Sequence, residues 1–207
     1  MIFLLGIAIS FIGSLPFGMI NMAVAHTAIR RGMGPALAMA AGASLIEFLQ
    51  AFVSLKFTAI FTGNPTIEHI FEAIASVVFI AGSIYFFFFA KTKASTGDDE
   101  PPVKRRHEFM KGIFLSAINV MAIPYWIFYG TLLAANGWLK MENLPVAIFS
   151  LGTMAGTFGL LVLYSLLGVK ILRRSETITR WVNRFIGLVL LGFGVYTLGK
   201  LLGAGLW

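Results

Sequence analysis

The stretch Gly34–Phe57, GPALAMAAGASLIEFLQAFVSLKF, decides how this chain folds. It is long and apolar enough to cross a bilayer as one helix, which takes about 20 mostly apolar residues. One carboxylate, Glu47, interrupts it near its centre. The residues at helical spacing around Glu47 are small, namely Ala36, Ala40, Ala43, Ala51 and Ser54. Because small residues line the contacts between membrane helices, this face is predicted to point toward other helices.

The composition of the whole chain extends this prediction. Of 207 residues, 58% are hydrophobic and only 12% are charged, and the mean hydropathy is +0.86. Soluble domains carry about 25% charged residues. We therefore predict an all-α integral membrane protein with six transmembrane helices and no room for a catalytic domain, hence no enzymatic activity. The predicted segments are Ile2–Ala25, Gly34–Phe57, Ile67–Ala90, Phe109–Ala135, Leu144–Val169 and Trp181–Leu202.

The basic residues predict the orientation. Thirteen of the 16 Lys and Arg residues fall on one side of the predicted helices, and Lys56, Lys140 and Lys200 fall on the other. Cytoplasmic loops are rich in Lys and Arg, so both termini are predicted to lie outside the cytoplasm. The first helix has no basic lead-in, which favours a retained helix over a cleaved signal. The net charge of +7 lies at membrane edges, so anionic lipid accounts for it and nucleic-acid binding is not expected.

Residues 91–108 are interpreted as a flexible cytoplasmic linker between two three-helix units, 1–90 and 109–207. Three is an odd number, so the second unit would cross the membrane in the opposite sense to the first. The two units would then form an inverted repeat. A short similarity supports this, because Gly6–Ser10 reads GIAIS and Gly112–Ser116 reads GIFLS.

An interruption of the predicted helix follows each of these two motifs. Corresponding broken helices in inverted repeats indicate the binding site of a transporter near the membrane midplane. A carboxylate at the bilayer centre costs roughly 2.5–3.5 kcal/mol on insertion scales, which favours a proton-carrying or ammonium-binding role for Glu47. Simple kinks and interhelical hydrogen bonds are the alternative roles of the prolines and asparagines. The predicted substrate-binding residues are Pro16, Gly18, Asn21, Glu47, Asn119 and Pro124.

Neither a metal site nor a cofactor is predicted. The chain has no Cys, and its three histidines, His26, His69 and His107, lie far apart in the sequence at helix edges or in the linker. Glycines in the last two segments are predicted to permit close helix packing, within one chain or in a homodimer. These are Gly152, Gly156, Gly159, Gly192, Gly199 and Gly203.

Three stretches resemble the LysE/RhtB-type amino-acid exporters. Ser14–Asn21 (SLPFGMIN) is similar to their Pro-x-Gly-Pro stretch, and Ala41–Glu47 (AGASLIE) to their Gly-rich second helix with its acidic residue. Asn119–Trp126 (NVMAIPYW) is similar to the Asn-Pro segment that opens their second half. The chain departs from the family pattern at three positions. Met19 and Val120 stand where the family has proline, and Glu47 replaces the commoner Asp.

The resemblance implies a secondary exporter of the bacterial inner membrane. It would move amino acids or related small zwitterions outward by alternating access, in exchange for protons. Two alternatives remain open at this point. A divalent-metal exporter of the same superfamily would have to bind a hard cation with one membrane carboxylate, although such cations take about six oxygen ligands. A six-helix channel for small neutral solutes would need two Asn-Pro-Ala motifs, which the chain lacks.

Overall fold

The computed structural model of the chain describes residues 1–15, 18–61, 65–84, 87–88, 105–119 and 122–173, together with 184, 187–188, 190–192, 194–199, 201 and 203. Every element in this part of the chain is a helix. The labelled helices are α1 (Ile2–Gly13), α2 (Met19–Arg31), α3 (Met33–Phe61), α4 (Pro65–Ile84), α5 (Arg105–Ala117), α6 (Ala122–Ala135) and α7 (Asn143–Arg173). A further apolar helix, Leu190–Gly199, lies near the carboxyl terminus.

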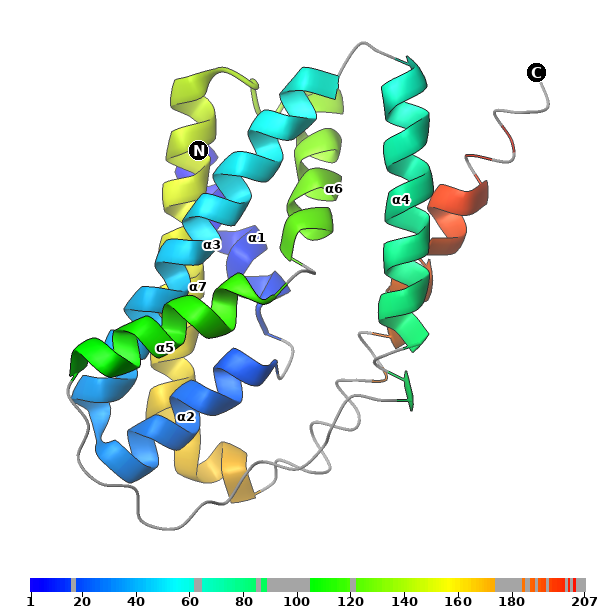
Figure 1. Cartoon of the computed structure of the whole chain (residues 1–207). Coiled ribbons are helices and arrows are strands. Elements are labelled where there is room, and N and C mark those ends of the chain that lie inside the picture. The colour runs from blue at the N-terminus through cyan, green and yellow to red at the C-terminus, as the bar shows by residue number, and fades with distance from the viewer. Residues whose placement is uncertain are drawn as a thin grey trace.

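The first and fourth predicted segments each form two shorter helices. Figure 1 shows α3 and α7 running the full length of the bundle, while α1 and α6 occupy one half of that length and α2 and α5 the other. Helix α1 ends at Gly13, ahead of Pro16, whose ring nitrogen has no hydrogen to donate. Helix α2 continues to Arg31, beyond the expected end at Ala25, and a left-handed Gly32 (φ 86°) then turns the chain into α3.

Several of the helices are long and apolar enough to span a membrane. By length and composition, α3 over Met33–Thr58 and α7 over Asn143–Gly168 can each cross a bilayer. Helices α5 and α6 qualify together as one span bent by 64°. Within the described residues there are therefore two or three candidate spans, and the six-helix arrangement stays a prediction.

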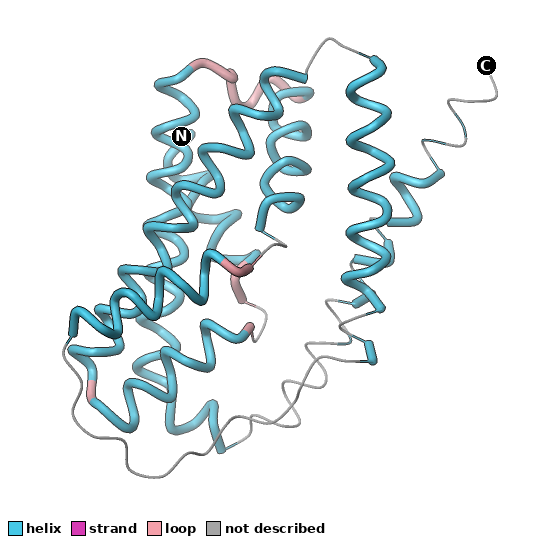
Figure 2. Tube along the Cα trace, in the orientation of Figure 1, coloured by secondary structure: helices cyan, strands magenta, loops and turns pink. Residues whose placement is uncertain are grey.

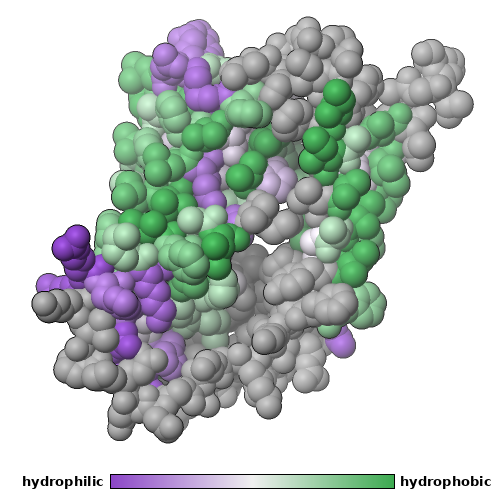
Figure 3. All heavy atoms as spheres, viewed as in Figure 1, coloured by the Kyte–Doolittle hydropathy of each residue, from purple (hydrophilic) through white to green (hydrophobic). Residues whose placement is uncertain are grey.

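The long helices expose large apolar residues and bury small polar ones among the apolar residues of the core. Helix α3 exposes Leu45, Leu49 and Val53 while it buries Ser44 and Ser54. Helix α7 likewise exposes Leu144, Leu151 and Leu166, and buries Ser150, Thr153 and Thr157. Figure 3 shows the resulting hydrophobic surface between hydrophilic groups at the two ends of the described part. Such a large apolar surface suits contact with lipid and not with water.

Each pair of half-length helices packs on the long helix of the other half of the chain. Helices α1 and α2 contact α7, helices α5 and α6 contact α3, and α3 and α7 contact each other. In the tube view the ends of the two breaks, at 14–18 and 118–122, lie about midway between the ends of the bundle (Figure 2). Helix α4 lies beside the C-terminal helix, where Ser83 Oγ donates to Gly187 O across 2.8 Å.

Glycines make the closest of these helix crossings. A Cβ at Gly6 would collide with Phe149 O, and one at Gly152 would collide with Phe3 O. At the other crossing, a Cβ at Gly112 would collide with Met39 O, and one at Gly42 with Phe109 O.

The predicted role of glycine in close packing is therefore correct for Gly152 and also for Gly156, whose Cβ would meet Ile7 O. At four other glycines a Cβ meets no described atom within 4 Å, so packing there against a second copy of the chain stays a prediction. These are Gly159, Gly192, Gly199 and Gly203.

Candidate substrate-binding site

Glu47 lies in the middle of α3 and faces the interior of the bundle. The small residues predicted to share its face are all buried, from Ala36 through Ala43 and Ala51 to Ser54. Glu47 itself is 9% exposed. The prediction that this face points toward other helices is confirmed, because the helical repeat of 3.6 residues places these positions on one stripe.

Trp126 of α6 is the hydrogen-bond partner of Glu47. Its indole Nε1 donates to Glu47 Oε1 across 2.7 Å, and the ring is 1% exposed. The ring packs edge-on against Tyr125 and Phe149, with centroids 4.9 and 5.9 Å away. The sequence analysis did not select Trp126, although it ends the stretch Asn119–Trp126. A single Trp in an apolar stretch of sequence does not indicate which buried group accepts a hydrogen bond from its N–H.

The break between α1 and α2 leaves backbone carbonyls that side chains from several helices bind. Asn21 Nδ2 donates to Ser14 O across 2.8 Å, and Tyr164 Oη of α7 donates to Leu15 O across 2.8 Å. Tyr125 Oη of α6 donates to Ile9 O across 2.9 Å. Gly18 caps α2 without a side chain. Pro16, the remaining predicted site residue here, lies outside the described residues.

A side chain of α3 likewise binds backbone carbonyls at the break between α5 and α6. Gln50 Nε2 donates to Ser116 O across 3.3 Å and to Asn119 O across 3.5 Å. The side chain of Asn119 is exposed. Pro124 is the third residue of α6 and so lies in its first turn, where a missing N–H costs no helical bond. Pro124 thus stands in the start of a new helix and does not kink a continuous one.

These contacts bring part of the predicted site together. Tyr125 reaches the first break while its neighbour Trp126 binds Glu47. Gln50, one turn after Glu47, reaches the second break. Glu47 therefore lies one turn before the residue that binds the second break, and its partner Trp126 lies next to the residue that contacts α1. Within the described residues no group of three His, Cys, Asp or Glu side chains could hold a metal ion.

A second buried carboxylate lies at the basic end of the bundle. Glu108, placed by the sequence analysis at the end of the linker, belongs to the first turn of α5 and is fully buried. It forms an ion pair with Arg31, the last residue of α2. Helix α5 thus begins at Arg105, before the expected boundary at Phe109, and residues 91–104 lie outside the described part.

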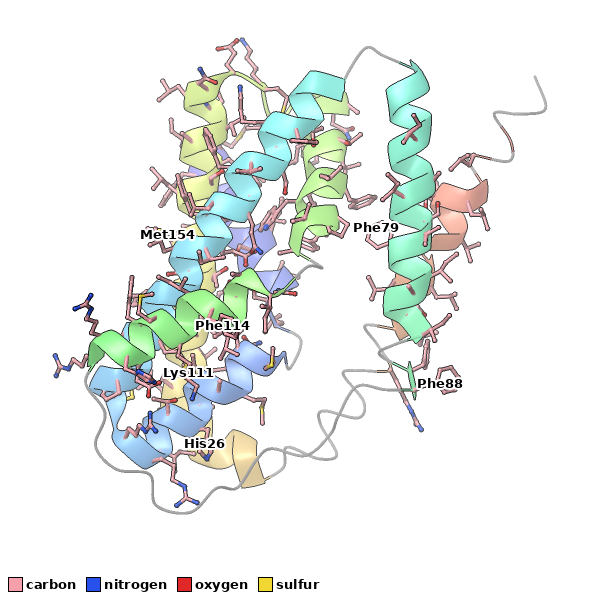
Figure 4. The ribbon with its side chains drawn as sticks, in the orientation of Figure 1. His26, Phe79, Phe88, Lys111, Phe114 and Met154 are labelled. Carbon is pink, nitrogen blue, oxygen red and sulfur yellow. The ribbon has the colours of Figure 1, made fainter. Side chains whose placement is uncertain are left out.

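Cations crowd the space around this ion pair. Figure 4 shows His26 on α2 and Lys111 on α5 near this end of the bundle. Burial lowers the pKa of His26, and the charges of Arg30 and then Lys111 lower it further. His26 is therefore expected to be neutral at pH 7, since its ordinary value is 6.5.

Comparison with known proteins agrees with this arrangement. The family model described as LysE type translocator matches residues 11–200, which is most of the chain. No curated protein and no solved structure matches the sequence. The match covers both breaks and Glu47. The chain therefore belongs to the LysE type translocator family and is a membrane transporter.

Proposed function

We propose that this transporter exports amino acids or related small zwitterions across the bacterial cytoplasmic membrane in exchange for protons. One observation carries the proposal. Glu47 is buried in the middle of a helix long enough to span the membrane, hydrogen-bonded to Trp126 and one turn before Gln50, which binds the second break. A buried carboxylate at membrane depth marks a substrate or proton pathway, because its burial is costly otherwise.

In the proposed cycle the substrate is bound by charge at both of its ends. Its carboxylate lies at the amino end of a half-helix, near Gly18 of α2 or near Pro124 of α6, where helix dipoles favour negative charge. Its ammonium is bound by Glu47. The freed carbonyls of Ser14 and Leu15 already accept hydrogen bonds from side chains, so the carboxylate is the stronger partner for the ammonium. Protonation of Glu47 from outside then releases the substrate.

An inverted repeat would supply the two access states. The glycine crossings support it, because Gly6 and Gly112 occupy the same place in the GIAIS and GIFLS motifs. Each contacts the long helix of the other half, Gly6 at Phe149 and Gly152, and Gly112 at Met39 and Ala43. We propose that the end carrying Arg31 and Arg105 faces the cytoplasm and that rocking of the halves exposes Glu47 to either side.

Of the alternatives, the structure favours neither metal export nor a neutral-solute channel. A divalent cation would need several carboxylate ligands beside Glu47, and none of the described acidic residues forms such a group with it.

The test is Glu47→Gln, purified and placed in proteoliposomes loaded with amino acids. We expect an outward proton-driven flux in the wild type and none in the variant, with similar thermal unfolding. Glu142→Gln is the matched control, because Glu142 is an exposed carboxylate in the turn before α7. Flux through Glu47→Gln equal to wild type would overturn the assigned role. Stabilisation of the wild type by Mn²⁺ and by no amino acid would favour the metal exporter.

A further inference from the structure

Two more polar side chains follow Glu47 on the interior side of α3. Gln50 lies three residues after Glu47 and Ser54 lies seven after it, so the three positions fall on one stripe of the helix. Glu47 and Ser54 are buried, and Gln50 is half-buried. The stripe runs from the centre of the bundle toward the end of α3 at Phe61.

The orientation of the Gln50 amide is determined by its surroundings. Its nitrogen points at two carbonyl oxygens, Ser116 O and Asn119 O, which only a donor can satisfy. The amide oxygen therefore points away from the second break. This Oε1 atom is buried and has no hydrogen-bond partner within the described part of the chain.

The hydroxyl of Ser54, one turn further along α3, is in the same situation as the amide oxygen of Gln50. This hydroxyl is buried, the residue is 2% exposed, and the oxygen has no partner among the described residues. A serine in a helix commonly bonds the carbonyl four residues earlier. Thr58 and Ser165 do this, donating to Ser54 O and Leu161 O. Buried polar atoms are almost always hydrogen-bonded, so these two atoms, one turn apart on α3, each call for a hydrogen-bond partner that the described part of the chain does not supply.

We propose that Gln50 Oε1 and Ser54 Oγ bind the transported substrate beside Glu47, with Gln50 accepting a hydrogen bond from its ammonium. The proposal rests on the proposed function and adds two contacts to it. A carboxylate and an amide oxygen on one stripe suit a primary ammonium, which has three N–H donors to place. The nitrogen of the same Gln50 amide binds the backbone carbonyls at the second break. Substrate binding to the Gln50 oxygen therefore acts directly on the α5–α6 junction.

The test compares ligand-induced thermal stabilisation of purified protein in detergent. The proteinogenic L-amino acids are added one at a time, followed by the N-acetyl derivative of each one that stabilises the wild type. Acetylation removes the ammonium and leaves the carboxylate. We expect the wild type to bind the free amino acid at least about tenfold more tightly than its derivative, as the loss of a charged hydrogen bond implies.

Gln50→Met should reduce this preference to about twofold. Ser54→Ala should leave the unfolding temperature without ligand equal to or above that of the wild type, because it removes an unpaired hydroxyl, and should still weaken binding about fivefold. Asn136→Ala and Ser165→Ala are the matched controls. Each loses a side chain that donates to the backbone carbonyl four residues earlier, and each should keep wild-type binding and preference.

The outcomes separate the two proposals. If the wild type binds amino acids and both variants keep its affinity and preference, the role of Gln50 and Ser54 is overturned and the proposed function stands. If Ser54→Ala lowers the unfolding temperature without ligand, the hydroxyl has a structural partner and is not a substrate contact. If no amino acid stabilises the wild type, the proposed function and this inference both fall.

Discussion

Trp126 Nε1 donates a hydrogen bond to Glu47 Oε1 across 2.7 Å, and this bond joins the middle of α3 to the second turn of α6. It satisfies one oxygen of a carboxylate that has little access to water. The bond also links the acidic residue to the helix that starts at the second break. Loss of this bond should therefore affect both stability and transport, whereas Glu47→Gln keeps an oxygen that can accept it.

Trp126→Phe keeps an aromatic ring in the core and removes the donor. We expect a loss of about 1–3 kcal/mol in unfolding free energy, because a buried acceptor is left unpaired. In a Glu47→Leu background, where no acceptor remains, the loss should be smaller, and a double-mutant cycle of thermal unfolding measures the difference. Trp138→Phe, at an exposed indole, should be neutral. Equal losses in both backgrounds would mean that the hydrogen bond contributes nothing.

Gly152→Ala and Gly112→Ala should each destabilise the fold by about 1–3 kcal/mol or more, since each new methyl meets a backbone carbonyl that has no room to move. Gly159→Ala, on the same helix as Gly152, is the control. No described atom lies within 4 Å of its Cβ, so it should be neutral or slightly stabilising. Denaturant or thermal unfolding in detergent measures all three. Equal tolerance at Gly152 and Gly159 would contradict the close crossing of α1 and α7.

Arg31→Met should cost about 3 kcal/mol, because it leaves the fully buried Glu108 without its cation. The double variant Arg31→Met/Glu108→Met should recover most of this loss, since a pair of apolar side chains needs no desolvated charge. Unfolding temperatures of the single and double variants test the prediction. Arg106→Met, at an exposed position of α5, should change little. A double variant less stable than Arg31→Met would show that Glu108 is stabilised by other groups.

Single cysteines test the proposed orientation, because the natural chain has none. Asn136→Cys and His107→Cys place thiols at exposed positions, in the turn after α6 and in the first turn of α5. We expect a membrane-impermeant maleimide to label Asn136→Cys in intact cells, and His107→Cys only after the membrane is opened. The opposite pattern would reverse the direction of transport that we propose.

The amino-acid sequence by itself determined the helices, the inward face of α3 and the positions of both breaks. These features depend on local properties, namely apolar length, a stripe of small residues and proline's missing N–H, which neighbouring residues in the chain supply. The inward orientation of Glu47 follows from the same stripe.

Only the tertiary structure decided which side chains form hydrogen bonds and ion pairs with groups on other helices. The bond between Trp126 and Glu47, the reach of Gln50 to the second break and the ion pair between Arg31 and Glu108 each join helices distant in sequence. Glu108 shows why the sequence was insufficient. In a polar stretch next to Arg105 and Arg106 it is typical of a solvated linker, and burial follows only because α5 crosses α3 closely at Gly112 and Gly42. The angle of that crossing depends on contacts between separate helices, and no local pattern encodes it.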